Sequence, residues 1–176
     1  MGVKWFKFIR KDGVNSMVFF VGEYPRQLDE RNRFILPAKV REKLSMAQLR
    51  DLAREKLSGI VYITRSPSEK CLNLYTEEEW EIIAQKVREL PTGTDRNAAM
   101  FQRRLFGKAM SCELDKQGRI PLTQELIDFA GLKKDIVLVG SNTKLEIWDA
   151  QSWDEVNECI DDDIVLDGIK QYNINI

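Results

Sequence analysis

The chain contains one motif twice, as LDERNRF at residues 28–34 and as LDKQGRI at residues 114–120. Each copy places an aspartate and an arginine four residues apart. The residue directly before the arginine is asparagine in the first copy and glycine in the second, and both residue types tolerate a positive φ. The motif therefore predicts a turn with a fixed charge at each end. The residues that carry this pattern are Asp29, Asn32 and Arg33, followed by Asp115, Gly118 and Arg119.

The two halves of the chain resemble each other beyond the motif. In both halves the arginine is followed by a short apolar segment and a helix, which Pro37 opens in the first half and Thr123 caps in the second. A β-branched run comes next, and we expect residues 60–63 to correspond to residues 136–139. Because each half has too few apolar residues for a core of its own, we expect one pseudo-symmetric domain.

An alternating strand and a capped helix complete each half. Thr76 is the expected cap of the first of these helices, and Trp80 and Trp153 occupy the same position in the two helices. We interpret both tryptophans as core anchors rather than as platforms on which bases stack. The first half is longer, because Ser45 is expected to cap an additional helix that ends at Gly59.

The repeat divides the chain into five predicted segments. Met17 begins a β-rich apolar run and is a candidate functional start. The acidic last segment is expected to contain a final helix. The segments are an N-terminal extension at residues 1–16, a first repeat at 17–80, connecting helices at 81–106, a second repeat at 107–153 and an acidic C-terminal tail at 154–176.

Composition excludes several classes of protein. The 176 residues contain no histidine, which excludes Ser-His-Asp and Cys-His hydrolases. Cys71, Cys112 and Cys159 lie far apart, so they indicate neither a disulfide framework nor a zinc site. No run approaches the roughly 20 apolar residues that cross a bilayer. We therefore interpret the chain as a cytoplasmic protein with no membrane partner and no enzymatic activity.

The charges are segregated, although the formal net charge is only −1. Residues 24–43 hold six basic and three acidic residues, and residues 96–119 hold six basic and two acidic residues. These two basic regions contain the two motifs, whereas the tail is acidic. The pattern fits either a polyanion bound to one face or a solvated surface. The pair Arg103 and Arg104 fits equally a solvated helix face and an oligomer contact.

Taken together, these residues resemble the MraZ family, bacterial transcriptional regulators related in fold to the AbrB DNA-binding proteins. The family signature is a pair of Asp-x-x-x-Arg motifs, each followed by a short helix. The first motif has Arg31-Asn32 where the family usually has Lys-Gly, which keeps a basic residue and a residue that adopts positive φ. The likeness covers about residues 17–153. Further matching residues are Gly22-Glu23-Tyr24, Pro37, Glu79-Trp80, Arg103, Phe106, Ala109, Ala130-Gly131-Leu132, Val139-Gly140 and Glu146-Ile147-Trp148.

The resemblance implies an α+β fold of a particular kind. We expect a pseudo-two-fold, AbrB-like swapped-hairpin β-barrel built from two tandem half-units, with helices packed outside. The resemblance also implies homo-oligomeric rings that bind double-stranded DNA at short direct repeats in the protein's own promoter. Such a regulator would control the bacterial division and cell-wall gene cluster and would be associated with the nucleoid. The resemblance implies no cofactor.

Each motif allows two readings of its arginine. The arginine either pairs with its own aspartate in a local clasp or contacts DNA while the aspartate orients it. The resemblance favours DNA contact by Arg33 and Arg119, with Arg31 and Lys116 as phosphate partners. In this reading Asp29, Asp115, Asn32 and Gly118 orient the motif. The alternative function is an oligomeric protein-interaction scaffold whose nucleic-acid binding is incidental.

Overall fold

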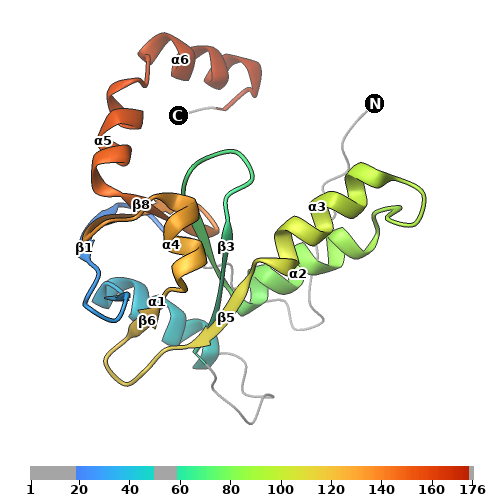
Figure 1. Ribbon diagram of the computed structural model, residues 1–176. Helices are drawn as coiled ribbons and strands as arrows, with labels where there is room; N and C mark the ends of the chain where they lie inside the picture. Colours follow the sequence, from blue (N-terminus) through green and yellow to red (C-terminus); the bar gives the residue numbers. More distant parts are fainter. Residues whose placement is uncertain (1–18, 50–58, 175–176) are drawn as a thin grey trace.

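The computed structural model of the protein describes residues 19–49 and 59–174 (Figure 1). It has a mixed α+β fold, as the sequence predicts. The expected N-terminal extension and the candidate start at Met17 lie outside the described residues. The elements in chain order are β1 (Glu23–Gln27), β2 (Arg33–Ile35), α1 (Ala38–Leu49), β3 (Ile60–Arg65), β4 (Leu72–Thr76), α2 (Glu77–Arg88), α3 (Arg96–Gly107), β5 (Met110–Glu113), β6 (Arg119–Pro121), α4 (Gln124–Ala130), β7 (Asp135–Ser141), β8 (Lys144–Asp149), α5 (Ala150–Glu158) and α6 (Asp162–Gln171).

The described strands form two antiparallel sheets. The larger sheet has six strands in the order β1-β7-β8-β4-β3-β5, and the smaller sheet is the pair β2–β6. β1 and β5 lie at opposite ends of the larger sheet and do not pair with each other, so the described strands do not close into a barrel. The α+β prediction is confirmed at this level, and the swapped-hairpin barrel stays a prediction.

Strand pairing is exchanged between the two halves of the chain. The first strand of each half pairs with the third strand of the other half, so that β1 pairs with β7 and β5 pairs with β3. The pairs β2–β6 and β4–β8 join equivalent strands, with Phe34 opposite Ile120 and Asn73 opposite Glu146 at their centres. The strand order is therefore unchanged when the halves are interchanged, which is a pseudo-two-fold arrangement.

One expected correspondence between the halves is wrong by one residue. Arg26 of β1 pairs with Ile136, and its equivalent in β5, Cys112, pairs with Val61. Val61 is therefore the residue of the first half that is equivalent to Ile136 of the second half. The sequence comparison matches Ile60 to Ile136 instead. Side chains alternate between the faces of a strand, so a slip of one residue would turn the buried face outward. Both Val61 and Ile136 are buried, which fixes the register.

The apolar core lies between the larger sheet, the β2–β6 pair and helices α1 and α4. Phe34 and Ile120 bury their side chains on the inner side of the β2–β6 pair. Thr123 caps α4 by accepting a hydrogen bond from the N–H of Leu126, and Gly131 ends α4 with φ of 62°, as predicted. This packing leaves the opposite side of the β2–β6 pair free to carry polar side chains.

Helices α2 and α3 form a hairpin that projects from the body of the molecule (Figure 1). The predicted cap Thr76 accepts from the N–H of Glu79 at the start of α2. Trp80 is buried, with its ring centroid 5.1 Å from that of Tyr62 in a stacked arrangement, so it anchors this hairpin to β3. Trp153 is only half-buried and lies 5.6 Å from the ring of Trp148, at the margin of the core.

Two further expectations about helices can be compared with the structure. The expected helix break at Ser45 is wrong, because α1 continues through this residue to Leu49. Most of the additional helix expected before Gly59 lies outside the described residues. The final helix is confirmed as α6. In residues 19–49 and 59–174, no helix is long and apolar enough to cross a membrane. The five segment boundaries stay predictions.

Candidate nucleic-acid interface

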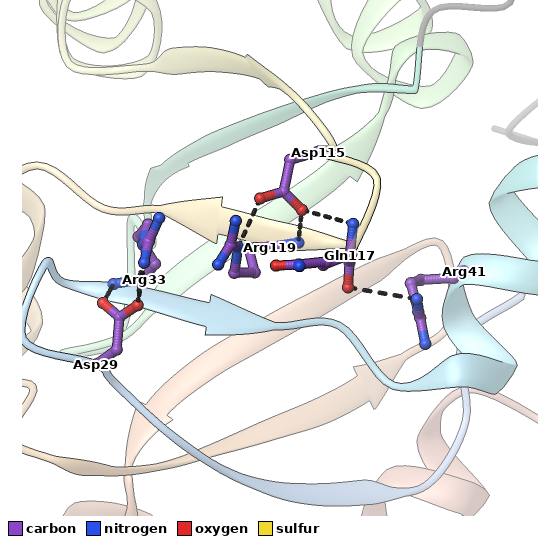
Figure 2. A network of polar contacts seen from close by, with 6 residues as sticks. All are labelled: Asp29, Arg33, Arg41, Asp115, Gln117 and Arg119. Carbon is purple, nitrogen blue, oxygen red and sulfur yellow. Dashed lines mark hydrogen bonds and ion pairs between the residues drawn. The ribbon is translucent and has the colours of Figure 1, made fainter.

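The first motif folds into a turn around the carboxylate of Asp29 (Figure 2). Asp29 Oδ1 accepts hydrogen bonds from the backbone N–H groups of Arg31 and Arg33, both at 2.9 Å. Its other oxygen, Oδ2, accepts from Arg33 Nε at 2.9 Å and lies 2.8 Å from Arg33 Nη2. Asn32 has a φ of 56°, as the motif predicts. The turn is therefore closed by one carboxylate that holds both the backbone and the guanidinium group.

The second motif repeats this geometry. Asp115 Oδ1 accepts from the N–H groups of Gln117 and Arg119, both at 2.9 Å, and Oδ2 accepts from Arg119 Nε at 2.6 Å. Gly118 has a φ of 72°. The local clasp is thus present in both copies (Figure 2). It fixes each arginine and does not by itself exclude contact with a ligand, because a guanidinium group carries five N–H donors.

Both carboxylates have pKa values of about 2, against an ordinary value of 3.8. For Asp29 the largest cause is the hydrogen bond from the Arg33 side chain, followed by the backbone N–H of Arg33. For Asp115 the backbone N–H of Arg119 comes first and the Arg119 side chain second. Both carboxyl groups are therefore ionised near neutral pH, and the clasps persist there.

The β2–β6 pair brings the two turns together. Arg33 lies opposite Pro121 and Arg119 lies opposite Ile35, so these four side chains share the face that points away from the core. Diagonal neighbours on such a face are about 7–8 Å apart, which places the two arginines side by side. We call this face, defined by Arg33, Ile35, Arg119 and Pro121, the arginine face.

Hydrogen bonds across the pseudo-two-fold axis hold the arginine face in shape. The N–H of Leu36 donates to Gly118 O at 2.9 Å, and the N–H of Leu122 donates to Asn32 O at 2.8 Å. Asn32 and Gly118, the two residues with positive φ, thus each accept a hydrogen bond from the residue directly after the short strand of the other half. Arg26 of β1 adds a further link by donating from Nε to Ile35 O at 3.0 Å. The two turns consequently form one rigid unit.

The arginines keep part of their surface exposed. The Arg33 and Arg119 side chains are 26% and 32% exposed. Beyond the contacts to their own aspartates, neither guanidinium group donates a hydrogen bond to another residue in the part of the chain that the structure describes. The remaining N–H donors can therefore reach an external acceptor such as a base edge or a phosphate oxygen.

The predicted phosphate partners lie at the tips of the turns. Arg31 and Lys116 are exposed. Their side chains make no hydrogen bond or ion pair within residues 19–49 and 59–174. The structure thus places four cationic side chains on and around one face, two of them held by carboxylates and two of them extended into solvent.

Arg41 is a contributor that sequence reasoning missed as a site residue. It lies on α1, and its Nη1 donates to Gln117 O at 3.3 Å in the second turn (Figure 2). Its Nε is buried and has no partner among the described residues. Arg41 was visible in the sequence only as part of the basic excess near the first motif. Nothing local indicates that it packs on the turn of the other half.

The cysteines and acidic residues show no arrangement for a metal ion in the described part of the chain. Burial raises the pKa of the Cys71 thiol to about 12 and that of the Cys112 thiol to about 11. Both thiols are therefore protonated near neutral pH and poor ligands or nucleophiles. Cys159 is exposed at the end of α5.

Comparison with known proteins gives matches over both halves. Residues 19–104 and 105–163 each match the family model described as "MraZ protein, putative antitoxin-like". The chain is 37% identical over 139 residues to a protein of Clostridium acetobutylicum named "Transcriptional regulator MraZ", which covers 79% of this chain and 87% of the relative. It is 36% identical over 156 residues to a protein of the same name from Clostridium botulinum, covering 88% and 99%. Both Asp-Arg turns lie within the matched regions.

Proposed function

The chain belongs to the MraZ family, and we propose that it is a transcriptional regulator that binds double-stranded DNA through the arginine face. The proposed sites are short direct repeats in its own promoter, upstream of the bacterial division and cell-wall gene cluster. The protein would act there as a homo-oligomeric ring, without a cofactor and without enzymatic activity. It would reside in the cytoplasm in association with the nucleoid.

The observation that carries this proposal is the pair Arg33 and Arg119, held side by side on a two-stranded antiparallel ribbon. A two-stranded ribbon fits the major groove, which is about 12 Å wide. Arginine is well suited to bidentate contact with guanine, and an aspartate that fixes its orientation reduces the entropy lost on binding. The arginine face therefore has the shape and the chemistry of a base-reading surface.

Arg31 and Lys116 supply the complementary electrostatic part of the proposal. Both are exposed at the tips of turns that flank the ribbon. Contacts to phosphate position a protein on the duplex and give it salt-dependent affinity, whereas contacts to base edges give specificity. We therefore assign phosphate contact to Arg31 and Lys116 and base contact to Arg33 and Arg119.

The exchanged strand pairing supports the AbrB-like, swapped-hairpin part of the proposal. The first strand of each half is paired with the third strand of the other half, as β1–β7 and β5–β3. This exchange is what two interleaved hairpins require. In the proposed fold the β2–β6 ribbon would be the DNA-reading edge of the interleaved unit.

A ring would turn weak single contacts into tight binding. Each chain presents one arginine face, so several chains in a ring present several like-oriented faces. Binding of one face raises the effective concentration of the next face at a neighbouring site. Direct repeats suit such a cyclic array, because all of its faces are related by rotation in the same sense.

The proposal is tested with DNA from upstream of the protein's own gene. We expect the wild-type protein to bind it more tightly than unrelated DNA, with affinity that falls steeply as salt rises. Arg33→Ala with Arg119→Ala should abolish the preference. A matched control is Lys86→Ala with Arg88→Ala, which removes the same charge from exposed positions on α2. Equal binding by the wild type and the arginine variant would refute the proposed interface.

The second candidate function is an oligomeric protein-interaction scaffold. It is favoured by apolar side chains that are exposed on the helices outside the core, including Met100, Phe101 and Ile164. Under this alternative the Arg33→Ala and Arg119→Ala variant would lose DNA affinity in vitro and leave transcription from the target promoter unchanged. A promoter fusion measured with both forms of the protein separates the two functions.

A further inference from the structure

Helix α6 is an amphipathic helix without a partner in the described chain. It buries no residue, and Ile164, Val165 and Leu166 are 69%, 47% and 50% exposed. Val165, Leu166 and Ile169 lie on one side of the helix, because Ile169 is four residues after Val165 and three after Leu166. Asp162 lies at the N-terminal end of this side, and Asp163 and Asp167 lie along the edge next to Leu166. The helix therefore presents an apolar stripe bordered by negative charge.

Helix α3 has the opposite charge pattern. It also buries no residue, and Met100 and Phe101 are 54% and 42% exposed. Arg96, Arg103 and Arg104 lie on the same side as Met100, at spacings of four, three and four residues. Helix α3 contains no acidic residue. Within the described residues, these arginine side chains form no ion pair. The outer face of α3 therefore presents Met100 among three arginines, with Phe101 beside them.

We propose that α6 of one copy of this chain packs on the outer face of α3 of a second copy. The apolar residues Val165 and Leu166 would cover Met100 and Phe101, and the neighbouring aspartates would face the arginines. Exposed apolar groups on a soluble protein commonly mark an interaction surface. Complementary charge at its rim fixes partner and orientation. Both features are present here, because α6 and α3 each expose apolar side chains and the charges that flank them are opposite in sign.

A second copy fits better than the same chain. Figure 1 shows α6 and the α2–α3 hairpin well apart, on different sides of the body. Because the two surfaces differ, a head-to-tail contact between two copies leaves α3 free on one copy and α6 free on the other for further copies. A head-to-tail contact gives a closed ring when the rotation between copies closes. The inference thus rests on the ring of the proposed function and names the contact that would close it.

Charge reversal tests the contact. We expect Arg103→Glu with Arg104→Glu, and separately Asp162→Lys with Asp163→Lys, to raise the protein concentration at which the assembly half-dissociates by at least about tenfold. A chain with all four substitutions should regain the wild-type assembly. Sedimentation velocity across a concentration series measures this. The matched control is Arg31→Glu with Lys116→Glu, which makes the same charge change on the arginine face and should leave the assembly intact while DNA binding is lost.

A disulfide test shows which chains are in contact, independently of charge. Exposed Cys159 is first replaced by serine. Differently tagged chains that carry either Met100→Cys or Val165→Cys are then mixed and oxidised. A linked product containing both tags is expected. A link that forms only inside a chain carrying both substitutions, and never in the mixture, would overturn the inference.

The outcomes separate this inference from the proposed function. If the wild-type protein assembles and neither charge reversal changes the assembly, the α6–α3 contact is refuted and the ring stands. If the wild-type protein is a monomer at every concentration, the contact and the ring are both refuted, and DNA binding by the arginine face is judged separately. Restoration by the fourfold variant, together with the mixed disulfide, supports the contact.

Discussion

Gly118 lies directly against the side chain of Arg41, so that a Cβ at position 118 would collide with Arg41 Cδ and approach its Nε to 3.0 Å. Gly118 also has a positive φ of 72°. Arg41 Nη1 reaches past it to Gln117 O. Helix α1 and the second turn therefore meet at a position where glycine is favoured twice, by the positive φ of the backbone and by the close Arg41 side chain.

Gly118→Ala is expected to destabilise the protein more than Asn32→Ala. Gly118→Ala places a Cβ at positive φ, which costs about 1–2 kcal/mol, whereas Asn32 already has a Cβ there and Asn32→Ala loses only the greater tolerance of asparagine for this conformation. Gly118→Ala also displaces the flexible end of the Arg41 side chain from Gln117 O, which adds about 0.5–1.5 kcal/mol for the lost hydrogen bond. This added cost should be absent when Arg41 is already alanine. Urea unfolding of the two single variants, of Arg41→Ala alone and of Gly118→Ala with Arg41→Ala measures the free energies, and purely additive effects of Gly118→Ala and Arg41→Ala would contradict the contact.

Stability should depend on the two motif carboxylates in a defined pH window. Asp29 and Asp115 have folded-state pKa values of about 2, below the ordinary 3.8, so the folded state binds fewer protons between these values. Their stabilisation is therefore fully present above about pH 4 and is lost as the pH falls through about 2. The difference in the free energy of unfolding between the wild type and Asp29→Asn with Asp115→Asn should shrink over that window.

A matched variant isolates this effect from the titration of other acids. Glu30→Gln with Glu113→Gln changes two exposed carboxyl groups next to the same motifs. The free-energy difference between this variant and the wild type should vary less with pH, because neither glutamate carboxylate accepts a hydrogen bond from an arginine in the part of the chain that the structure describes. If both pairs of variants gave the same pH profile, the clasps would not be the source of the pH dependence.

The turns could be predicted from sequence because their determinants are local. An aspartate, a residue that accepts positive φ and an arginine at fixed spacing define the clasp, and both copies adopt it. The caps at Thr76 and Thr123 were predictable for the same reason. The repeat also indicated pseudo-symmetry, which the exchanged strand order displays.

Features that depend on distant residues were not predictable. The run at residues 60–63 has apolar side chains on both faces, so its alternation could not select Val61 over Ile60 as the partner of Ile136 in the repeat. The contact of Arg41 with Gln117 spans 76 residues and has no local signal. The exposure of Trp153 depends on how α5 lies against β8, which the shared sequence position of the two tryptophans does not determine.

The aspartates should influence DNA specificity more than DNA affinity. Asp29→Asn and Asp115→Asn keep every arginine charge but remove the ionic clasp that orients it. We expect the preference for promoter DNA over unrelated DNA to fall by about tenfold, because a loosely held arginine loses its bidentate geometry. The salt dependence should stay near that of the wild type, since the number of phosphate contacts is unchanged. Competition binding with both DNAs at several salt concentrations measures both quantities.

Neutralising the glutamates again provides the control. Glu30→Gln with Glu113→Gln removes the same negative charge near the arginine face without touching a clasp. It should raise affinity for both DNAs alike and leave the preference intact. If the aspartate and glutamate variants behaved identically, the aspartates would act only through net charge and would have no orienting role.

Trp80 and Trp153 occupy equivalent positions in the repeat but should contribute unequally to stability. Trp80 is buried between β3 and α3, with ring centroids 5.1 Å from Tyr62 and 5.2 Å from Phe106, so its removal empties a cavity and detaches the α2–α3 hairpin. Trp80→Ala should lower the free energy of unfolding by about 3–5 kcal/mol. Trp153→Ala should cost about 1 kcal/mol, because Trp153 is half-buried against Trp148. Limited proteolysis of the Trp80 variant should cut first within the α2–α3 hairpin. Equal losses in the free energy of unfolding for the two tryptophan variants would contradict an anchoring role specific to Trp80.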